Sequence, residues 1–436
     1  MKTVAFHTLG CKVNQYETEA MEELFEKKGY TIVDGEGISD IYVINTCTVT
    51  NLSDRKSRQF IRKSKKINED SIIAVVGCYS QVSPDEVSGI EGVDVIIGTS
   101  ERNRIVELCE RAKASNEKIN IVKNIKANKE FEKIRIDEIK SKTRANIKIQ
   151  DGCNQFCSYC IIPYARGPIR SRDYDEIVDE VVKISNAGYK EVVLTGIHIA
   201  SYGKDNKMPL INLLKGIGQV EGIKRIRLGS LEPTLIDEDF MIGLKEIDKV
   251  CDHFHLSLQS GSDTVLKRMN RKYTTGIYKE KVDLIRKYMP DAGITTDIIV
   301  GFPGESDEEF KETCDFVKDI GFSRIHVFKY SPRKGTPAAS MENQIDGNIK
   351  NARSEKLIDL GEIVAENFRN KFINKNLVVL FEEENKKISN AFEGYTTNYL
   401  RVRILGKKSP IGEVKNIGIN GVSGDILIGK IWNKEV

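Results

Sequence analysis

Three cysteines close together in the middle of the chain constrain its fold and its chemistry more than any other feature. Cys153, Cys157 and Cys160 have the spacing C-x3-C-x2-C and follow the expected strand 147–150. Three thiolates at this spacing suit three corners of a cubane iron–sulfur cluster, because thiolate is the usual ligand of such clusters. The fourth iron would then lack a protein ligand and be open to a small molecule. The residues alone leave a zinc knuckle or redox-active thiols as alternatives.

A second cysteine triplet is spread through the first eighty residues. Each member follows a short β-branched, apolar run: Cys11 follows residues 4–10, Cys47 follows 41–46 and Cys78 follows 72–77. Such runs are typical of buried parallel strands, and helical patterns at 16–28 and 52–66 alternate with them. Because ligands in an open parallel α/β sheet bind at the carboxyl ends of its strands, we expect these cysteines to converge on one crevice. The alternative is three unrelated buried thiols, as we expect for Cys109, Cys251 and Cys314.

After residue 146, strand patterns and helical patterns alternate six times. The expected strands are 147–150, 191–195, 225–228, 253–258, 295–300 and 324–330. The helical patterns between them include 175–186, 210–220, 275–288 and 307–320. Six β/α units fall short of the eight in a closed barrel, so we expect a partial (β/α)6 barrel with its site at the carboxyl ends of the strands.

Polar residues and glycines follow these expected strands. They are Thr195 and Gly196 after the second strand, Ser230 and Glu232 after the third, Gln259 after the fourth, and Gly301 and Pro303 after the fifth. Glycine at a strand end lets the backbone approach a ligand closely. Turns also use glycine, but the register of these residues with the cysteine loop indicates one binding site. A capping-box pattern from Ser306 to Glu309 opens the next helix.

The C-terminal part of the chain has a different pattern. A long helical pattern at 349–372 precedes short strand-like runs at 377–381, 399–404 and 426–432, which indicate a small antiparallel β-barrel. Residues 371–436 carry 11 Lys and Arg against 7 Asp and Glu, a formal charge of +4. A basic β-barrel attached to an enzyme often binds nucleic acid, although a plain stability module is the alternative.

Two further basic segments are candidates for contact with a polyanion. Residues 55–66 contain seven Lys and Arg and no acid, and helical spacing would place Arg55, Arg58 and Arg62 on one face. The segment 166–172, just after the cysteine loop, contains Arg166, Arg170 and Arg172. A solvated helix face and an ion-pairing loop are the respective alternatives.

The 436 residues are enough for two or three domains with buried cores. We expect an N-terminal domain at 1–115, a linker at 116–138, a central domain at 139–370 and a C-terminal domain at 371–436. No run of about 18 apolar residues occurs, and residues 3–9 read as a strand and not as a signal peptide, which indicates a cytoplasmic protein. Metal binding or catalysis therefore explains nine cysteines better than structural disulfides do.

These features together resemble the methylthiotransferase family of radical S-adenosylmethionine (SAM) enzymes. The C-x3-C-x2-C loop is the signature of the radical SAM superfamily, and a three-cysteine α/β domain, a radical SAM barrel and a TRAM-like β-barrel occur together in that family. Residues 8–19, Thr-Leu-Gly-Cys-Lys-Val-Asn-Gln-Tyr-Glu-Thr-Glu, look like its MtaB-type branch, as do residues 166–172, Arg-Gly-Pro-Ile-Arg-Ser-Arg. The sister branch usually has Gly-Cys-Gln-Met-Asn at the first cysteine.

The resemblance implies two 4Fe–4S clusters and SAM as cofactors. Cys153, Cys157 and Cys160 would hold the SAM-cleaving cluster. Cys11, Cys47 and Cys78 would hold an auxiliary cluster, whose open iron would carry the sulfur to be transferred. The implied SAM contacts are Thr195, Gly196, Ser230, Glu232, Gln259, Gly301 and Pro303, and no catalytic residue is assigned beyond the clusters.

The resemblance also implies a substrate and partners. The activity would be radical methylthiolation of C2 of N6-threonylcarbamoyladenosine at position 37 of tRNA, which gives the 2-methylthio nucleoside. The tRNA anticodon loop would be bound, an electron donor such as flavodoxin or ferredoxin and a sulfur source would be needed, and no membrane is involved. The alternatives are a methylthiotransferase for isopentenyladenosine or for a ribosomal-protein aspartate, and a zinc-stabilised nucleic-acid-binding protein.

Overall fold

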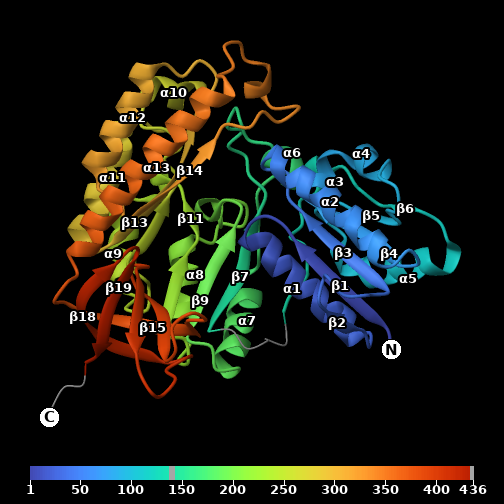
Figure 1. Ribbon diagram of the computed structural model, residues 1–436, viewed down its shortest axis with the longest axis horizontal. Helices are drawn as coiled ribbons and strands as arrows, with labels where there is room; N and C mark the ends of the chain where they lie inside the picture. The colour runs from blue at the N-terminus through green and yellow to red at the C-terminus, as the bar shows by residue number, and fades with distance from the viewer. Residues whose placement is uncertain (137–142, 433–436) are drawn as a thin grey trace.

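The N-terminal part of the chain is a six-stranded parallel sheet with the order β2-β1-β3-β4-β5-β6 (Figure 1). The computed structural model describes residues 1–136 and 143–432. The strands of this sheet are β1 (Thr3–Thr8), β2 (Thr31–Val33), β3 (Ile41–Thr46), β4 (Ile72–Gly77), β5 (Val95–Ile97) and β6 (Ile119–Asn120). Strands β3, β4 and β5 are rich in β-branched residues and wholly buried, as expected for a parallel sheet covered on both faces.

Helices cover both faces of this sheet. They are α1 (Lys12–Lys27), α2 (Asn51–Ile67), α3 (Cys78–Val82), α4 (Pro84–Ser88) and α5 (Ile105–Ser115). One core cluster joins α1 and α5 to the sheet through residues such as Phe25 and Leu108, and the other joins α2, α3 and α4 to the opposite face through residues such as Ile61 and Val87. The predicted open α/β domain is therefore confirmed as a three-layer sandwich.

The central part is a curved set of parallel strands. They are β7 (Arg144–Asp151), β9 (Glu191–Gly196), β10 (Arg225–Leu228), β11 (Ser230–Leu231), β12 (His253–Leu256), β13 (Gly293–Val300) and β14 (Arg324–Lys329), with the short β8 (Arg170–Ser171) antiparallel to β7. They form two four-stranded sheets, β10-β9-β7-β8 and β11-β12-β13-β14, and a bridge from Ile226 to Val250 leads from the first sheet toward the second. The predicted partial barrel is confirmed.

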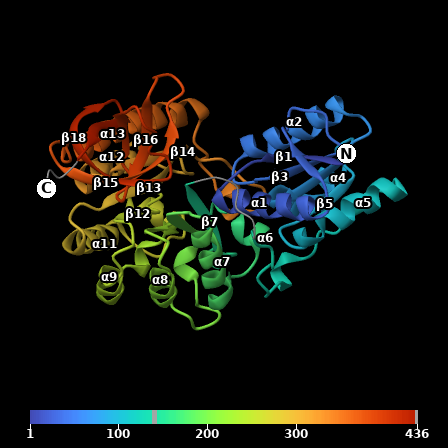
Figure 2. The same cartoon turned by 90° about the horizontal axis from the view of Figure 1, so that it is seen from below.

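An outer layer of helices covers this barrel (Figure 2). It contains α7 (Tyr174–Asn186), α8 (Leu210–Gly218), α9 (Glu238–Lys245), α10 (Asp263–Arg268), α11 (Thr275–Tyr288), α12 (Asp307–Ile320) and the long α13 (Gly347–Asn370). Helix α12 begins with the predicted capping box, in which Ser306 and Glu309 bind each other's backbone N–H groups. None of the helices in the described parts of the chain is long and apolar enough to cross a membrane.

The C-terminal part is a small closed barrel with the order β15-β16-β17-β19-β18. Its strands are β15 (Asn376–Glu384), β16 (Ala391–Thr396), β17 (Arg401–Leu405), β18 (Val414–Ser423) and β19 (Ile426–Ile431). The pattern predicted three of these strands and missed β16 and β18, in which Gly394, Gly418 and Gly421 interrupt the apolar periodicity. The pair β17–β19 is parallel, whereas the other described pairs are antiparallel.

A turn of this small barrel closes the amino-terminal end of the central barrel. Arg225 and Arg227, both buried in β10, donate hydrogen bonds to the backbone carbonyls of residues 395–397. Asn398 donates to the carbonyl of Asp291 at 3.0 Å, just before β13. The two barrels are therefore joined by buried charge-assisted hydrogen bonds, which are stronger than neutral ones.

The segment predicted as a linker, 116–138, is in large part structural. Strand β6 extends the N-terminal sheet beyond residue 115, and Ile125, Ile134 and Ile136 are buried, the last two against Tyr16 and Ala20 of α1. Ile134 and Ile136 have the spacing of a strand, but the segment around them is polar, and local spacing does not show that they pack against α1. The predicted boundary between residues 138 and 139 and the last four residues lie outside the described parts of the chain.

The turn at the base of the barrel gives a test of packing. A Cβ atom on Gly293 would collide with the carbonyl oxygen of Asn398, so we expect Gly293→Ala to lower stability by about 1–3 kcal/mol, as overpacking does. The matched control is Gly276→Ala in α11, where the nearest atom lies 3.7 Å from the added Cβ. Thermal unfolding compares the two variants, and an unchanged melting temperature for Gly293→Ala would contradict this packing.

Candidate functional site

The loop with Cys153, Cys157 and Cys160 leaves the carboxyl end of β7, where the barrel rule places a site. Gly152 turns the chain with φ +73°, and a Cβ there would collide with the carbonyl of Pro168. Gln150 stabilises the start of the loop, because its side-chain amide donates hydrogen bonds to the carbonyls of Asp151 and Gly152, each at 2.7 Å. The loop is therefore built on a rigid strand and not on a free surface segment.

The three thiols of this loop lie in one electrostatic environment. Burial, with a smaller contribution from the neighbouring Cys157, raises the pKa of Cys153 to about 11 and that of Cys160 to about 12. Arg271 donates to the Cys157 sulfur at 3.1 Å. A guanidinium directed at a sulfur favours the thiolate, which is the form that binds iron.

The triplet of the N-terminal sheet converges as predicted from the strand ends. A Cβ on Gly10, the residue before Cys11, would lie 3.1 Å from the sulfur of Cys47, so glycine leaves room there. Burial raises the pKa of Cys78 to about 12; Arg166 opposes this rise, and the nearby Cys47 and Cys11 contribute to it. Arg166 donates to the Cys78 sulfur at 3.3 Å. Each triplet thus has a buried arginine on one sulfur.

Both donor sets fit an iron–sulfur cluster better than a single metal ion. Among the residues the structure describes, no three His, Cys, Asp or Glu side chains are grouped as ligands of one metal ion. Structural zinc is almost always held by four protein ligands around one point. In a cubane each cysteine binds a different iron, so three convergent, separated thiols suit it.

A buried ion network joins the two triplets. Arg166 ends the short helix α6 (Ile162–Arg166), which begins two residues after Cys160. From there its guanidinium reaches Glu17 of α1 at 2.5 and 3.0 Å, Asn14 at 2.8 Å and Cys78 of α3. The path through one short helix and one side chain limits the distance between the two triplets to roughly 25 Å at most.

Lysine and arginine residues surround Glu17 and Asp151 in this network. Lys148 of β7 bridges Glu17 at 2.7 Å and Asp151 at 2.6 Å, and Arg102 pairs with both Glu17 and Glu132. Burial alone would raise the pKa of Glu17, but Arg102 and Arg166 lower it to about 2. Burial alone would likewise raise the pKa of Asp151, but Lys148 and Arg166 hold it well below its usual value.

The cations of this network outnumber its anions, and one of them, Arg166, contacts Cys78. Its described members are four cations, Arg102, Lys148, Arg166 and Arg170, and three anions, Glu17, Glu132 and Asp151. One positive charge is therefore in excess inside the protein, where an unpaired charge is costly. Arg166 lowers the pKa of Cys78 against the larger effect of burial, so this charge would stabilise a thiolate at Cys78 as a metal ligand.

The structure contradicts the prediction that Arg166, Arg170 and Arg172 contact a tRNA. Their side chains are 0, 2 and 3% exposed. Arg166 and Arg170 belong to the network, and Arg172 pairs with Glu180 of α7. The sequence did not reveal this because the acids that pair with Arg166 and Arg172 come from α1 and α7, outside the basic run.

The basic face predicted for residues 55–66 lies on the surface of α2. Arg55 and Arg62 are exposed, as are Lys56, Lys63 and Lys66. Arg58 is partly buried and donates to Tyr79 and to Glu86, each at 3.1 Å. Arg55 and Arg62 therefore remain candidates for a polyanion, whereas Arg58 already has partners.

The residues predicted at the strand ends lie where the barrel rule puts them. Glu232 is the most closely tied to the cysteine loop, because it accepts hydrogen bonds from Gln155 at 2.7 Å and pairs with His198 at 2.8 Å and Arg271 at 3.3 Å. The other candidates are Thr195 and Gly196 at the end of β9, Ser230 in β11, Gln259 after β12, and Gly301 and Pro303 after β13.

Sequence reasoning missed Gln155, His198 and Arg271. Gln155 lies within the cysteine loop, and that position was the one available signal. His198 and Arg271 follow β9 and α10 without any motif, and only the fold brings them beside Glu232. The loop, Glu232 and these three side chains form a polar, partly buried rim suited to an amino acid-like ligand.

Two protein families match parts of the chain. The radical SAM superfamily matches residues 147–317, and the uncharacterized protein family UPF0004 matches residues 3–98. These ranges hold the two cysteine triplets separately.

Full-length relatives match the whole chain. The threonylcarbamoyladenosine tRNA methylthiotransferase MtaB of Bacillus subtilis is 46% identical over 96% of this chain and 94% of the relative. The protein of the same name from Aquifex aeolicus is 39% identical over 93% of this chain and 97% of the relative. The tRNA-2-methylthio-N(6)-dimethylallyladenosine synthase of Alkaliphilus oremlandii is 37% identical over 94% of this chain and 89% of the relative.

Solved structures share the fold of most of the chain. The radical SAM methyltransferase TsrM from Kitasatospora setae, solved with cobalamin and a 4Fe–4S cluster, has a TM-score of 0.58 at 16% identity, over 78% of this chain and 77% of that one. The cobalamin-dependent radical enzyme OxsB has a TM-score of 0.52 at 14% identity, over 84% and 56% of the two chains. These likenesses support the arrangement of the sheet and the barrel.

The ion network predicts a specific acid sensitivity. Because the pKa of Glu17 falls from 4.5 to about 2 on folding, its stabilising effect is full above pH 4.5 and is lost as the pH falls toward 2. Glu17→Gln leaves buried cations unpaired, so we expect a loss of about 3–5 kcal/mol at pH 7 and a weaker dependence on pH in that window.

Urea unfolding at pH 7 and at pH 3 measures both effects. The matched control is Glu107→Gln, which removes only an exposed pair with Arg104. A Glu17→Gln variant that unfolds at the urea concentration of the unmodified protein would contradict the role of the network.

Proposed function

The chain belongs to the radical SAM methylthiotransferase family, and we propose that it transfers a methylthio group to C2 of N6-threonylcarbamoyladenosine at position 37 of tRNA. One observation carries the proposal: the buried Arg166 connects two cysteine triplets, one in the N-terminal sheet and one in the barrel. A reaction that needs two clusters close to one substrate atom explains this arrangement. The relatives named MtaB that match nearly the full chain support the same choice of nucleoside.

The two triplets take different roles in this proposal. Cys153, Cys157 and Cys160 hold the cluster that binds SAM, and Cys11, Cys47 and Cys78 hold the auxiliary cluster. When bound, SAM and the two clusters supply the carbon radical and the sulfur that an unactivated aromatic C–H bond requires. The protein supplies orientation and the exclusion of water.

Side chains at the strand ends orient SAM in this proposal. Glu232, with Gln155, His198 and Arg271 around it, is suited to the amino group of the methionine part, because a buried carboxylate binds an ammonium group strongly. Thr195, Gly196, Ser230, Gln259, Gly301 and Pro303 line the remaining strand ends as further contacts. Glycine at two of these positions lets the backbone approach the ligand.

The tRNA contacts must come from exposed cations. The α2 face with Arg55 and Arg62 and the basic C-terminal barrel, TRAM-like in its closed five-stranded form, are the proposed surfaces. Bases of an anticodon loop are accessible to proteins that read single strands by stacking and edge contacts. The proposal also includes an electron donor and a sulfur source as partners of the reaction, and a cytoplasmic location of the protein.

Mass spectrometry of tRNA nucleosides from a deletion strain tests the function. We expect the methylthio form of threonylcarbamoyladenosine to disappear and its unmethylthiolated precursor to accumulate. Loss of the methylthio form of isopentenyladenosine with the threonylcarbamoyl form intact would assign the chain to the other substrate. No change in either nucleoside would contradict a tRNA methylthiotransferase.

The division of roles between the triplets predicts different defects. Cys157→Ala removes a ligand of the SAM-binding cluster, so we expect no SAM cleavage and no product. Cys47→Ala should retain SAM cleavage but form no methylthio product. Chromatography of 5′-deoxyadenosine and of the modified nucleoside measures both, with Cys314→Ala as the control because that thiol packs in the barrel core. Full product from Cys47→Ala would contradict the auxiliary site.

The α2 surface predicts a salt-dependent effect. Arg55→Gln and Arg62→Gln should each weaken tRNA binding and lower the slope of log affinity against log salt by about one. The control is Lys318→Gln, an exposed residue on α12 that pairs with Asp315. Filter binding at several salt concentrations gives the slopes, and slopes equal to that of the unmodified protein would show that α2 does not bind the phosphates.

A further inference from the structure

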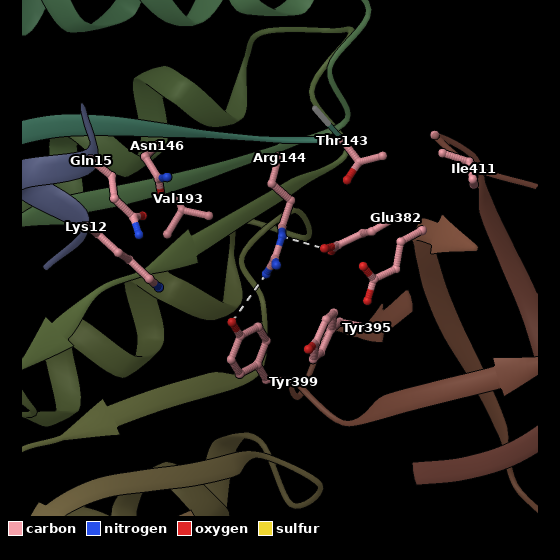
Figure 3. A pocket seen from close by; sticks show the side chains of 12 residues that line it. Lys12, Gln15, Thr143, Arg144, Asn146, Val193, Glu382, Tyr395, Tyr399 and Ile411 are labelled. Carbon is pink, nitrogen blue, oxygen red and sulfur yellow. Dashed lines mark hydrogen bonds and ion pairs between the residues drawn. The ribbon is translucent and has the colours of Figure 1, made fainter. Parts of the chain in front are cut away.

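A cavity of about 690 Å³ lies where the three parts of the chain meet (Figure 3). Lys12 and Gln15 enter it from the first turns of α1, directly after the triplet residue Cys11. Asn146 of β7 and Val193 of β9 form one wall. Arg144, Glu382 and two tyrosines of the small barrel, Tyr395 and Tyr399, form the other (Figure 3).

The floor of the cavity is Tyr399, which the fold holds in place firmly. Its backbone has φ +69°, a left-handed conformation that is rare and costly for a bulky residue. The ring stacks on Tyr395 at 4.9 Å and lies 4.7 Å from His253, while the Arg227 guanidinium lies 4.5 Å from its centre. Residues that their surroundings hold in a rare backbone conformation are most common at ligand-binding sites.

Two cations of this cavity, Arg144 and Lys12, act on the hydroxyl of Tyr399. Burial alone would raise the pKa of the Tyr399 phenol, but Arg144 and Lys12 lower it below its ordinary value. Arg144 also donates to the Tyr399 hydroxyl at 3.4 Å and pairs with Glu382 at 2.8 Å. The phenol oxygen therefore lies in a field that attracts an anion.

Lys12 is the cation that has no counter-ion there. Arg144 pairs with Glu382, Arg227 pairs with Glu191, and Glu383 pairs with Arg401. Among the described residues, no hydrogen bond or ion pair involves the Lys12 ammonium, and its side chain is exposed at the cavity. An unpaired ammonium between an amide, a guanidinium and a phenol is a receptor for a carboxylate.

We propose that Lys12, with Arg144 and Tyr399, binds the carboxylate of the amino acid substituent on the substrate adenosine. This inference rests on the proposed function. C2 and C6, which carries the substituent, are separated by N1 on the adenine ring, so a base with C2 at the clusters holds the carboxylate at the end of its long substituent farther from them. Lys12 follows Cys11 in the chain and points away from the cysteine loop, into the cavity at the opposite end of β7.

The same contact explains selection between modified adenosines. A threonylcarbamoyl group brings one negative charge to Lys12, whereas an isopentenyl group brings none and forms no ion pair with the ammonium. A site that pairs with a charged group of its substrate discriminates against the analogue that lacks this group. Lys12 is therefore a specificity-determining residue.

Anticodon stem-loop RNAs that differ by one charge test the proposal. One carries N6-threonylcarbamoyladenosine, the second its methyl ester, and the third N6-isopentenyladenosine, so all share the same phosphates. We measure dissociation constants and kcat/KM with the reconstituted holoenzyme, with Lys12→Gln and with the control Lys279→Gln on the outer helix α11. We compare the ratio of kcat/KM on two RNAs within one preparation of each variant. A loss of folded protein or of clusters lowers both values equally and leaves this ratio unchanged.

We expect the unmodified enzyme to prefer the acid over the ester. In Lys12→Gln the acid-to-ester ratio should fall about 10- to 100-fold, the value of a charge-assisted hydrogen bond. Lys279→Gln should keep the ratio of the unmodified enzyme. Equal losses on acid and ester would indicate a phosphate contact or a structural role and would overturn the inference.

The two hypotheses fail in different ways. If the unmodified enzyme acts on acid and ester equally well, the carboxylate receptor is wrong and the proposed function stands. If it acts on the isopentenyl stem-loop alone, the proposed function fails and the inference fails with it.

Discussion

The buried ion network around Glu17 is the interaction on which the arrangement of this molecule depends. Glu17 of α1 is shared by Arg102 of its own domain and by Lys148 and Arg166 of the barrel, with all four side chains out of contact with water. Breaking such a network leaves charges unpaired, so the N-terminal sheet and the barrel are held in one orientation. Because Arg166 also binds Cys78, the same contacts set how the two cysteine triplets face each other.

Much of this architecture follows from the sequence. The alternation of β-branched runs and helical patterns predicted both α/β parts, and the rule that sites lie at the carboxyl ends of parallel strands predicted that Cys11, Cys47 and Cys78 would meet. These inferences succeed because they use local periodicity and the fixed polarity of parallel sheets. The long helix α13 and the small closed barrel were recognised in the same way, from period and composition.

The parts that could not be predicted depend on contacts between distant residues. Arg166, Arg170 and Arg172 read as a basic loop for nucleic acid, but Glu17, Asp151 and Glu180 bury them. The cavity beside Lys12 requires a turn of the C-terminal barrel to meet the first turn of α1, although almost four hundred residues separate them. Neither motif nor period carries such information, since both describe neighbours along the chain.

Analysis of iron, acid-labile sulfide and zinc in anaerobically purified protein tests the central claim most directly. Two cubane clusters lie on either side of Arg166 in this account, and three cysteines hold each of them. They predict a brown protein with about eight iron and eight sulfide per chain. The variant Cys78→Ser should retain about half of each, because only one triplet is altered. A colourless protein that holds one or two zinc and no sulfide would contradict the account.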